Sequence, residues 1–219
     1  WASTTALSFD GTNDHVTTGT DGTVASKTYV WWMKATQTTD NHAIFSHDTD
    51  SGAVGGFFLN HFESYGLSRE YLYYHGSLRR QWDDNAAQDD GNWHHWVLYL
   101  DTSDVRESKL YVDGSEVSIA NTTGSTSGLP TSWDPLKIGF GNSNYAAFIL
   151  SEFAIFNGNK ISSIGTYYNS GTPWDMTGED DLDLYYIFEE GSGTSVTDSS
   201  TNDNAGTLVN SPTWVTDAP

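Results

Sequence analysis

The feature that most restricts the fold of this chain is the frequent recurrence of turn-forming residues along it. Short aromatic and β-branched runs alternate with clusters of Thr, Ser, Gly, Asn and Asp along the whole length. Runs of this kind, bounded by turn residues, are typical of β-strands. We expect the clearest strands at residues 28–33, 56–62, 70–75, 93–100, 109–112, 136–139, 148–156 and 182–188. No fixed-period repeat, Pro-rich linker or low-complexity tract interrupts the pattern, so the sequence predicts one all-β sandwich or jelly-roll domain over residues 1–219.

Two local patterns predict particular elements. Residues 109–118 place Asp113-Gly114 between two alternating stretches, and this dipeptide favours a tight β-hairpin because both of its residues tolerate positive φ. Residues 161–169 are the only stretch with helical spacing, and Gly171 follows just beyond, so we expect one short helix there.

The run at residues 93–100 carries large side chains at both odd and even positions. A strand in a two-layer sandwich normally has one solvent-exposed face. The second aromatic face therefore predicts either a further covering layer or an exposed groove.

Charge and composition exclude several classes of protein. Nine Lys and Arg against 29 Asp and Glu give a formal charge of −20, which repels nucleic-acid phosphates and anionic lipid. There is no cysteine, so disulfide frameworks and thiolate sites are excluded, and no apolar run approaches the length of a membrane helix. The chain begins at Trp1 without initiator Met or leader, so we expect it to be processed, excised or incompletely numbered.

Several runs occur in an order that resembles the LamG-like jelly-roll domains of the concanavalin A-like lectin and glucanase superfamily. The runs are residues 6–16, Trp93-His94-His95, and residues 110–114, 136–139, 151–157, 168–171, 185–194 and 198–208. The resemblance implies two packed antiparallel sheets, adjacent terminal strands and often a bound calcium. It also implies non-catalytic recognition of glycans or proteins in adhesins, secreted enzymes or phage particles. One departure is Thr201, which stands where the family usually has Gly in a turn. Because a β-branched residue resists positive φ, the geometry of this loop is expected to differ from the family's.

Oxygen-bearing side chains alternate through one loop near the C-terminus, a pattern that suits a hard cation. The residues are Asp198, Ser200, Asn202 and Asn204. We expect a structural calcium there, with Asp10, Asp14 and Glu190 brought toward the same edge by the fold that the resemblance implies. The alternative is an Asx-rich turn whose side chains satisfy their own backbone. Two further acidic loops, at residues 47–52 and 83–91, lack the distal Glu of an EF-hand and are interpreted as solvated turns.

Catalysis has weaker support than binding. Glucanases of this superfamily use paired carboxylates, and the nearest match is Glu179, Asp181 and Asp183, which lacks the closing Glu and falls in a loop leading into a late strand. His94 and His95 are adjacent, so they point to opposite faces of a strand and cannot chelate a metal together. We therefore predict no catalytic residues.

Aromatic rings for stacking on sugars are abundant, although core packing is the alternative for each one. We expect the glycan site in residues 65–82, where Arg69, Arg79 and Arg80 lie among aromatic residues. The predicted ligand-binding residues are Tyr71, Tyr73, His75, Arg79 and Trp82.

The sequence is compatible with three functions, in decreasing order of preference. The first is an extracellular or surface-displayed glycan-binding or adhesion module supported by calcium, whose partner is a glycan or a cell-surface or particle-surface protein. The second is a structural or decoration protein of a phage virion or other surface assembly. The third is a glycoside hydrolase of the same fold. Neither nucleic acid nor membrane insertion is expected, and the sequence leaves the ligand's identity and the oligomeric state open.

Overall fold

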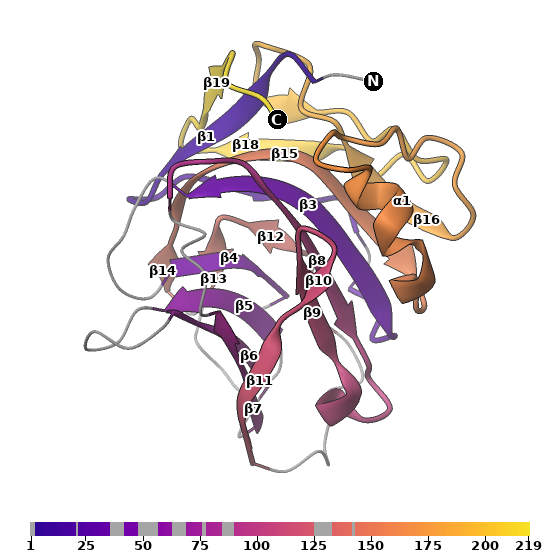
Figure 1. Cartoon of the computed structure of the whole chain (residues 1–219). Helices are drawn as coiled ribbons and strands as arrows, with labels where there is room; N and C mark the ends of the chain where they lie inside the picture. The colour runs from indigo at the N-terminus through magenta and orange to yellow at the C-terminus, as the bar shows by residue number, and fades with distance from the viewer. Residues whose placement is uncertain are drawn as a thin grey trace.

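The chain folds into two stacked β-sheets with a short helix on one outer face, as the computed structural model in Figure 1 shows. The structure describes residues 3–20, 22–35, 42–47, 57–62, 69–75, 78–84, 90–124, 133–141 and 143–219. The predicted all-β jelly-roll architecture is confirmed.

The first sheet, called sheet A, runs in the order β10-β9-β8-β3-β15-β1-β19, and β16 also pairs with β15. Its strands are β1 (Ala6–Asp10), β3 (Lys27–Ala35), β8 (His94–Leu100), β9 (Lys109–Val112), β10 (Ser115–Glu116), β15 (Ala147–Asn157), β16 (Leu182–Tyr186) and β19 (Thr213–Val215). All of its described pairings are antiparallel.

The second sheet, called sheet B, runs in the order β11-β7-β6-β5-β4-β12-β2-β18-β17, and β13 pairs with β14 as a separate hairpin. The strands are β2 (His15–Thr17), β4 (His42–Ser46), β5 (Phe57–Phe62), β6 (Arg69–His75), β7 (Leu78–Asp84), β11 (Ser118–Thr123), β12 (Lys137–Ile138), β13 (Phe140–Gly141), β14 (Asn144–Tyr145), β17 (Ser195–Val196) and β18 (Gly206–Val209). The two ends of the chain meet in both sheets, because β1 pairs with β19 and β2 pairs with β18.

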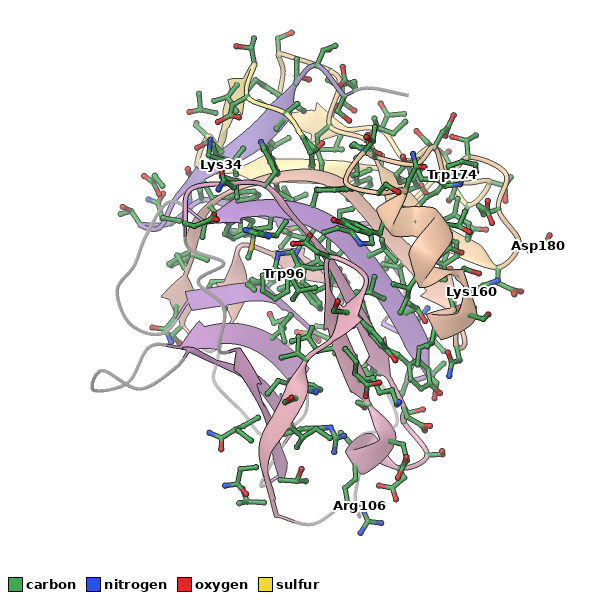
Figure 2. The ribbon with its side chains drawn as sticks, viewed as in Figure 1. Lys34, Trp96, Arg106, Lys160, Trp174 and Asp180 are labelled. Carbon is green, nitrogen blue, oxygen red and sulfur yellow. The ribbon has the colours of Figure 1, made fainter. Side chains whose placement is uncertain are left out.

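The main core lies between the inner faces of the two sheets. Trp31 of β3 stacks on Trp96 of β8 at 6.1 Å between ring centroids, and its edge meets Phe45 of β4 at 5.2 Å. All three side chains are fully buried, and Figure 2 shows Trp96 inside the sandwich. The hydrophobic effect on these large rings is the main force that holds the sheets together.

A second apolar cluster covers the outer face of sheet A. Val30 and Val97 pack there against Ile164 and Tyr167 of α1 (Ile164–Tyr168) and against Met176 of the following loop. A 3₁₀ turn, η2 (Ile161–Ser163), leads into α1. The large side chains on both faces of β8 are thus explained by a covering layer rather than by an exposed groove.

Both local predictions are confirmed. Asp113 and Gly114 have φ of 48° and 77° and join β9 to β10. The helix begins and ends inside the predicted segment, and Asn169 closes it in the left-handed conformation at φ 43°. Thr201 does not need positive φ, because the left-handed position of its loop falls at Asp203, with φ 55°.

Lysines of the first three quarters of the chain neutralise part of its acidic end. Lys27 of β3 pairs with Asp183 at 2.6 Å, Lys34 pairs with Asp217 at 2.8 Å, and η1 (Val105–Glu107) carries a separate local pair between Arg106 and Asp104 at 2.6 Å. Among the described residues, no helix is long and apolar enough to cross a membrane.

Candidate ligand-binding site

A hollow of about 360 Å³ opens on the outer side of sheet B beside the β13–β14 hairpin. It is lined by His15, Phe140, Ser143 and Tyr145. Figure 1 shows β13 and β14 next to β4 at one end of the sandwich, away from α1. The volume falls in the range of about 300–1,000 Å³ that is usual for small-molecule sites.

Strand alternation directs the side chains of β2 and β12 into this region. Val16 and Ile138 are fully buried in the core between the sheets. Their neighbours His15 and Lys137 therefore point to the opposite face, because successive side chains in a strand alternate. Both of these are half-buried rather than exposed.

Two glycines fix the hairpin tightly against the sandwich. Gly139 has φ 87°, and a Cβ at this position would lie 2.8 Å from Phe9 Cδ1. A Cβ on Gly141 would lie 2.9 Å from Ser46 Cβ, and the Ser46 hydroxyl donates a 2.7 Å hydrogen bond to the Phe140 carbonyl. The backbone of the site is thus held by close contacts that larger residues would disrupt.

Three rings form the apolar wall of the hollow. The ring centroids of Phe140 and Tyr145 are 4.9 Å apart, and those of His15 lie 5.7 Å from Phe140 and 6.1 Å from Tyr145. Lys137 Nζ lies 5.1 Å from the Phe140 centroid, which is cation–π distance. Phe140 is itself buried, so the half-buried His15 and Tyr145 supply the ring surface that a ligand can reach.

The lining combines ring faces with polar groups that both donate and accept hydrogen bonds. The hydroxyls of Ser143 and Tyr145 and the imidazole of His15 surround the apolar wall. The lining residues within the described part of the chain include no carboxylate, whereas hydrolysis of a glycoside normally needs a pair of them. The chemistry of this hollow is therefore that of a binding site for a ligand with both apolar faces and hydroxyls.

The predicted calcium loop is held by hydrogen bonds of its own. Asp198 Oδ1 accepts from the backbone N–H groups of Tyr185 and Ser200, each at 2.9 Å. Asp198 Oδ2 accepts from the Ser200 hydroxyl and from Asn204 N, each at 2.8 Å. The side-chain amides of Asn202 and Asn204 both donate to the Asp183 carbonyl. This is the Asx-turn arrangement that the spacing also allowed, and four protein donors already surround the Asp198 carboxylate.

The other three predicted metal ligands do not join this loop as a set. Antiparallel pairing of β2 with β18 places Asp10 and Asp14 at the far end of that pair from Asn204. Burial raises the pKa of Asp14, whose carboxylate accepts from Asp10 N at 3.2 Å. Glu190 Oε1 accepts from Thr197 N at 2.7 Å. In the described parts of the chain, no group of three or more His, Cys, Asp or Glu side chains is placed to hold a metal ion, and the calcium ligand set stays a prediction.

Of the acidic run considered for catalysis, Glu179 and Asp181 lie in the predicted loop, whereas Asp183 lies within β16. Asp183 pairs with Lys27 at 2.6 Å, Asp181 pairs with Lys160 at 3.0 Å, and Glu179 accepts from the Trp174 indole at 3.3 Å. Three separate partners thus hold these three carboxylates. Figure 2 shows Lys160, Trp174 and Asp180 around α1, on the outer face of sheet A.

The predicted glycan residues lie on β6 and β7. The register pairs Tyr71 with Trp82 and His75 with Leu78. The side chains of Tyr71, Tyr73, His75 and Arg79 lie outside the described residues, so their role stays a prediction. Trp82 is only 1% exposed, and it belongs to the main core with the Arg80 guanidinium 5.8 Å from its ring.

Sequence reasoning missed most of the hollow. His15 and Ser143 lie among other polar residues in turn-rich segments, so neither stands out, and Phe140 belongs to a two-residue strand. The usable signal was the alternation around Val16, which places His15 on the face opposite the core. The pairing that brings β2 next to β12 joins residues more than 100 positions apart, and nothing local in the sequence encodes it.

Comparisons with known proteins agree with this architecture. A family model described as Laminin_G_3, concanavalin A-like lectin/glucanases superfamily, matches residues 10–161. A heptameric SAP-like pentraxin from Limulus polyphemus superposes with a TM-score of 0.59 at 15% identity, covering 77% of this chain and 83% of the pentraxin. Domains LG4-5 of the mouse laminin alpha1 chain give a TM-score of 0.49 at 16% identity, covering 68% of this chain and 41% of that one. No curated protein sequence matches the chain.

Proposed function

Because the chain belongs to the concanavalin A-like lectin/glucanases superfamily, we propose that it is a carbohydrate-binding domain whose ligand enters the hollow beside the β13–β14 hairpin. The observation that carries the proposal is the juxtaposition of His15 and Tyr145 rings with the Ser143 hydroxyl in one opening of about 360 Å³. Sugars need this combination, since their C–H faces pack on rings while their hydroxyls require directed hydrogen bonds.

We infer display outside the cell or on a particle surface, with glycan recognition in place of turnover. Calcium support of the fold stays a prediction.

Glycan-array screening followed by titration calorimetry tests the site. Tyr145→Ala removes a ring that a ligand would contact, and loss of an aromatic anchor costs about 2 kcal/mol or more, which is about thirtyfold in affinity. Tyr145→Phe keeps the ring and should retain part of the affinity. Trp174→Ala is the matched control, because Trp174 is 37% exposed yet lies beside α1 on the other side of the sandwich.

Two results would contradict the proposed site. One is unchanged affinity of the Tyr145→Ala protein for a glycan that the wild type binds. The other is an equal loss of affinity in the Trp174→Ala control, which would place binding at α1.

A second candidate function, a subunit of a surface assembly, is favoured by one observation. One of the two edge strands of sheet B, β11, is a six-residue strand without charged side chains, and among the described strands it pairs only with β7. Exposed edge strands of this kind can pair with another chain. Analytical ultracentrifugation over a concentration series tests this candidate, and a monomer at every concentration would contradict self-assembly.

A further inference from the structure

Two neighbouring rows of side chains cross sheet A on its outer face. The first row is apolar and packs beneath α1; it consists of Val97, Val30 and Ala154. The second row, which we call the polar row, consists of His95, Trp32 and Ser151. The register pairs Trp32 with His95 on one side and with Ser151 on the other.

The polar row is closed off from solvent. His95 and Ser151 are 0% exposed and Trp32 is 2% exposed. Four of their polar atoms have no hydrogen-bond partner within the described part of the chain: His95 Nδ1, His95 Nε2, Trp32 Nε1 and Ser151 Oγ. Leaving such a group unsatisfied costs about 1–3 kcal/mol, so buried polar atoms in proteins are nearly always bonded to protein or to water.

The three side chains cannot satisfy one another directly along the whole row. Trp32 stands between His95 and Ser151, so these two are separated by two strand spacings, or about 10 Å. Trp32 packs on His95 through its ring, at 5.1 Å between centroids, and the indole N–H donates to neither partner.

The polar row is flanked by α1 on one side and by the C-terminal segment on the other. The Tyr168 ring of α1 lies 6.3 Å from Trp32 and 5.9 Å from His95. One row further along, Asp217 near the C-terminus accepts from the Trp93 indole at 3.1 Å and pairs with Lys34 at 2.8 Å. The row therefore lies between the helix and the C-terminal segment, as a buried polar strip with apolar and ion-paired neighbours.

The polar residue next to Ser151 in the chain, by contrast, has its hydrogen bonds satisfied within the protein. Glu152 is fully buried at a bulge of β15, with φ 53°, and its carboxylate accepts from the hydroxyls of Ser3 and Tyr185. This carboxylate shows that the same face does bury polar groups when hydrogen bonds are supplied.

We propose that internal water molecules bind along the polar row and supply the hydrogen bonds that His95, Trp32 and Ser151 lack. A buried water needs two to four polar partners. The row offers an indole donor, a hydroxyl that both donates and accepts, and an imidazole with one donor and one acceptor nitrogen. Water held there would join β8, β3 and β15 beneath the seam between α1 and the C-terminal segment.

Two measurements on the wild-type protein test the proposal. In NMR spectra of ¹⁵N-labelled protein, the Trp32 indole proton should show a cross peak to water with the sign of a long-lived bound molecule. In a high-resolution crystal structure, water density should lie within hydrogen-bond distance of at least two of the four atoms. A missing cross peak together with a dry row in the crystal would overturn the proposal.

A pair of variants distinguishes the loss of bound water from a change in packing alone. Ser151→Ala removes one water partner and should weaken the Trp32 cross peak at least twofold. Ser46→Ala is the matched control, because Ser46 is equally buried but its hydroxyl donates to the Phe140 carbonyl. Equal effects of the two substitutions on the Trp32 cross peak would also count against the proposal.

Discussion

His95 should make this protein unusually sensitive to mild acid, and replacing it should remove that sensitivity. Burial lowers the pKa of His95 from 6.5 to about 3, against a smaller opposing effect of Asp113. The ring lies between Trp32 and Tyr168, on the outer face of sheet A, with no exposed surface. His95→Phe keeps a ring in this place and removes the titrating group.

The direction and the size of the change in stability with pH follow from proton linkage. Below pH 6.5 the unfolded chain binds a proton at His95, whereas the folded chain does not bind one until about pH 3. Stability is therefore lost as the pH falls through this window. A pKa of about 3 in the folded state and 6.5 in the unfolded state corresponds to about 3 kcal/mol of stability lost between pH 7 and pH 4.

Urea unfolding of wild type and His95→Phe at a series of pH values from 7 to 4 measures this effect. Both proteins share all other titrating groups, so the difference between their free energies of unfolding isolates His95. We expect the difference to change by about 3 kcal/mol in favour of the variant as the pH falls. A difference that does not vary with pH would refute the reasoning, whatever the variant's stability at pH 7. His95→Asn, which is polar and does not titrate, should behave as His95→Phe does.

Three further predictions concern other buried or strained positions. The hydrogen bond to Asp113 raises the pKa of His94, so its contribution to stability is present at low pH and lost as the pH rises through that raised value; His94→Gln should destabilise the protein more at pH 6 than at pH 8.5 in urea titrations. Asp198→Ala removes the acceptor of four hydrogen bonds and should cost about 2–4 kcal/mol by thermal melts; in the same assay, a higher wild-type melting temperature with calcium than with EDTA would support the predicted metal, and an unchanged temperature would contradict it. Gly139→Ala should cost at least about 1 kcal/mol, since φ is 87° and the new Cβ meets Phe9, and should weaken any glycan binding in the same calorimetric assay; wild-type stability would contradict the close packing of the hairpin.

Local patterns predicted the elements of the fold well. The Asp113-Gly114 turn, the helix near residues 161–169 and the long strand β15 all depend on neighbouring residues, and all three are present. The second face of β8 was left with two alternatives, because periodicity shows that a face is apolar but not what covers it. Only the packing of α1 on Val97 decided between them.

The candidate site was harder to predict because it depends on pairing between distant segments. Alternate oxygen-bearing residues from Asp198 to Asn204 fit a calcium loop and an Asx turn equally well, and the hydrogen bonds of the structure form the turn. Trp82 stood among cations and other rings in the sequence, yet its strand places it inside the core. The hollow at His15 arises where β2 meets β12, and a single sequence carries no signal for that register.

The pairing of the chain's two ends has a consequence for how the protein folds. Ala6 of β1 pairs with Val215 of β19, and Val16 of β2 pairs with Leu208 of β18, so both sheets contain a contact between strands about 200 residues apart. Closing loops of this length before the contacts stabilise them makes folding slow. Neither sheet is complete until residues 206–215 have left the ribosome, so the aromatic strands made earlier must be kept from aggregating until these late strands have been synthesised.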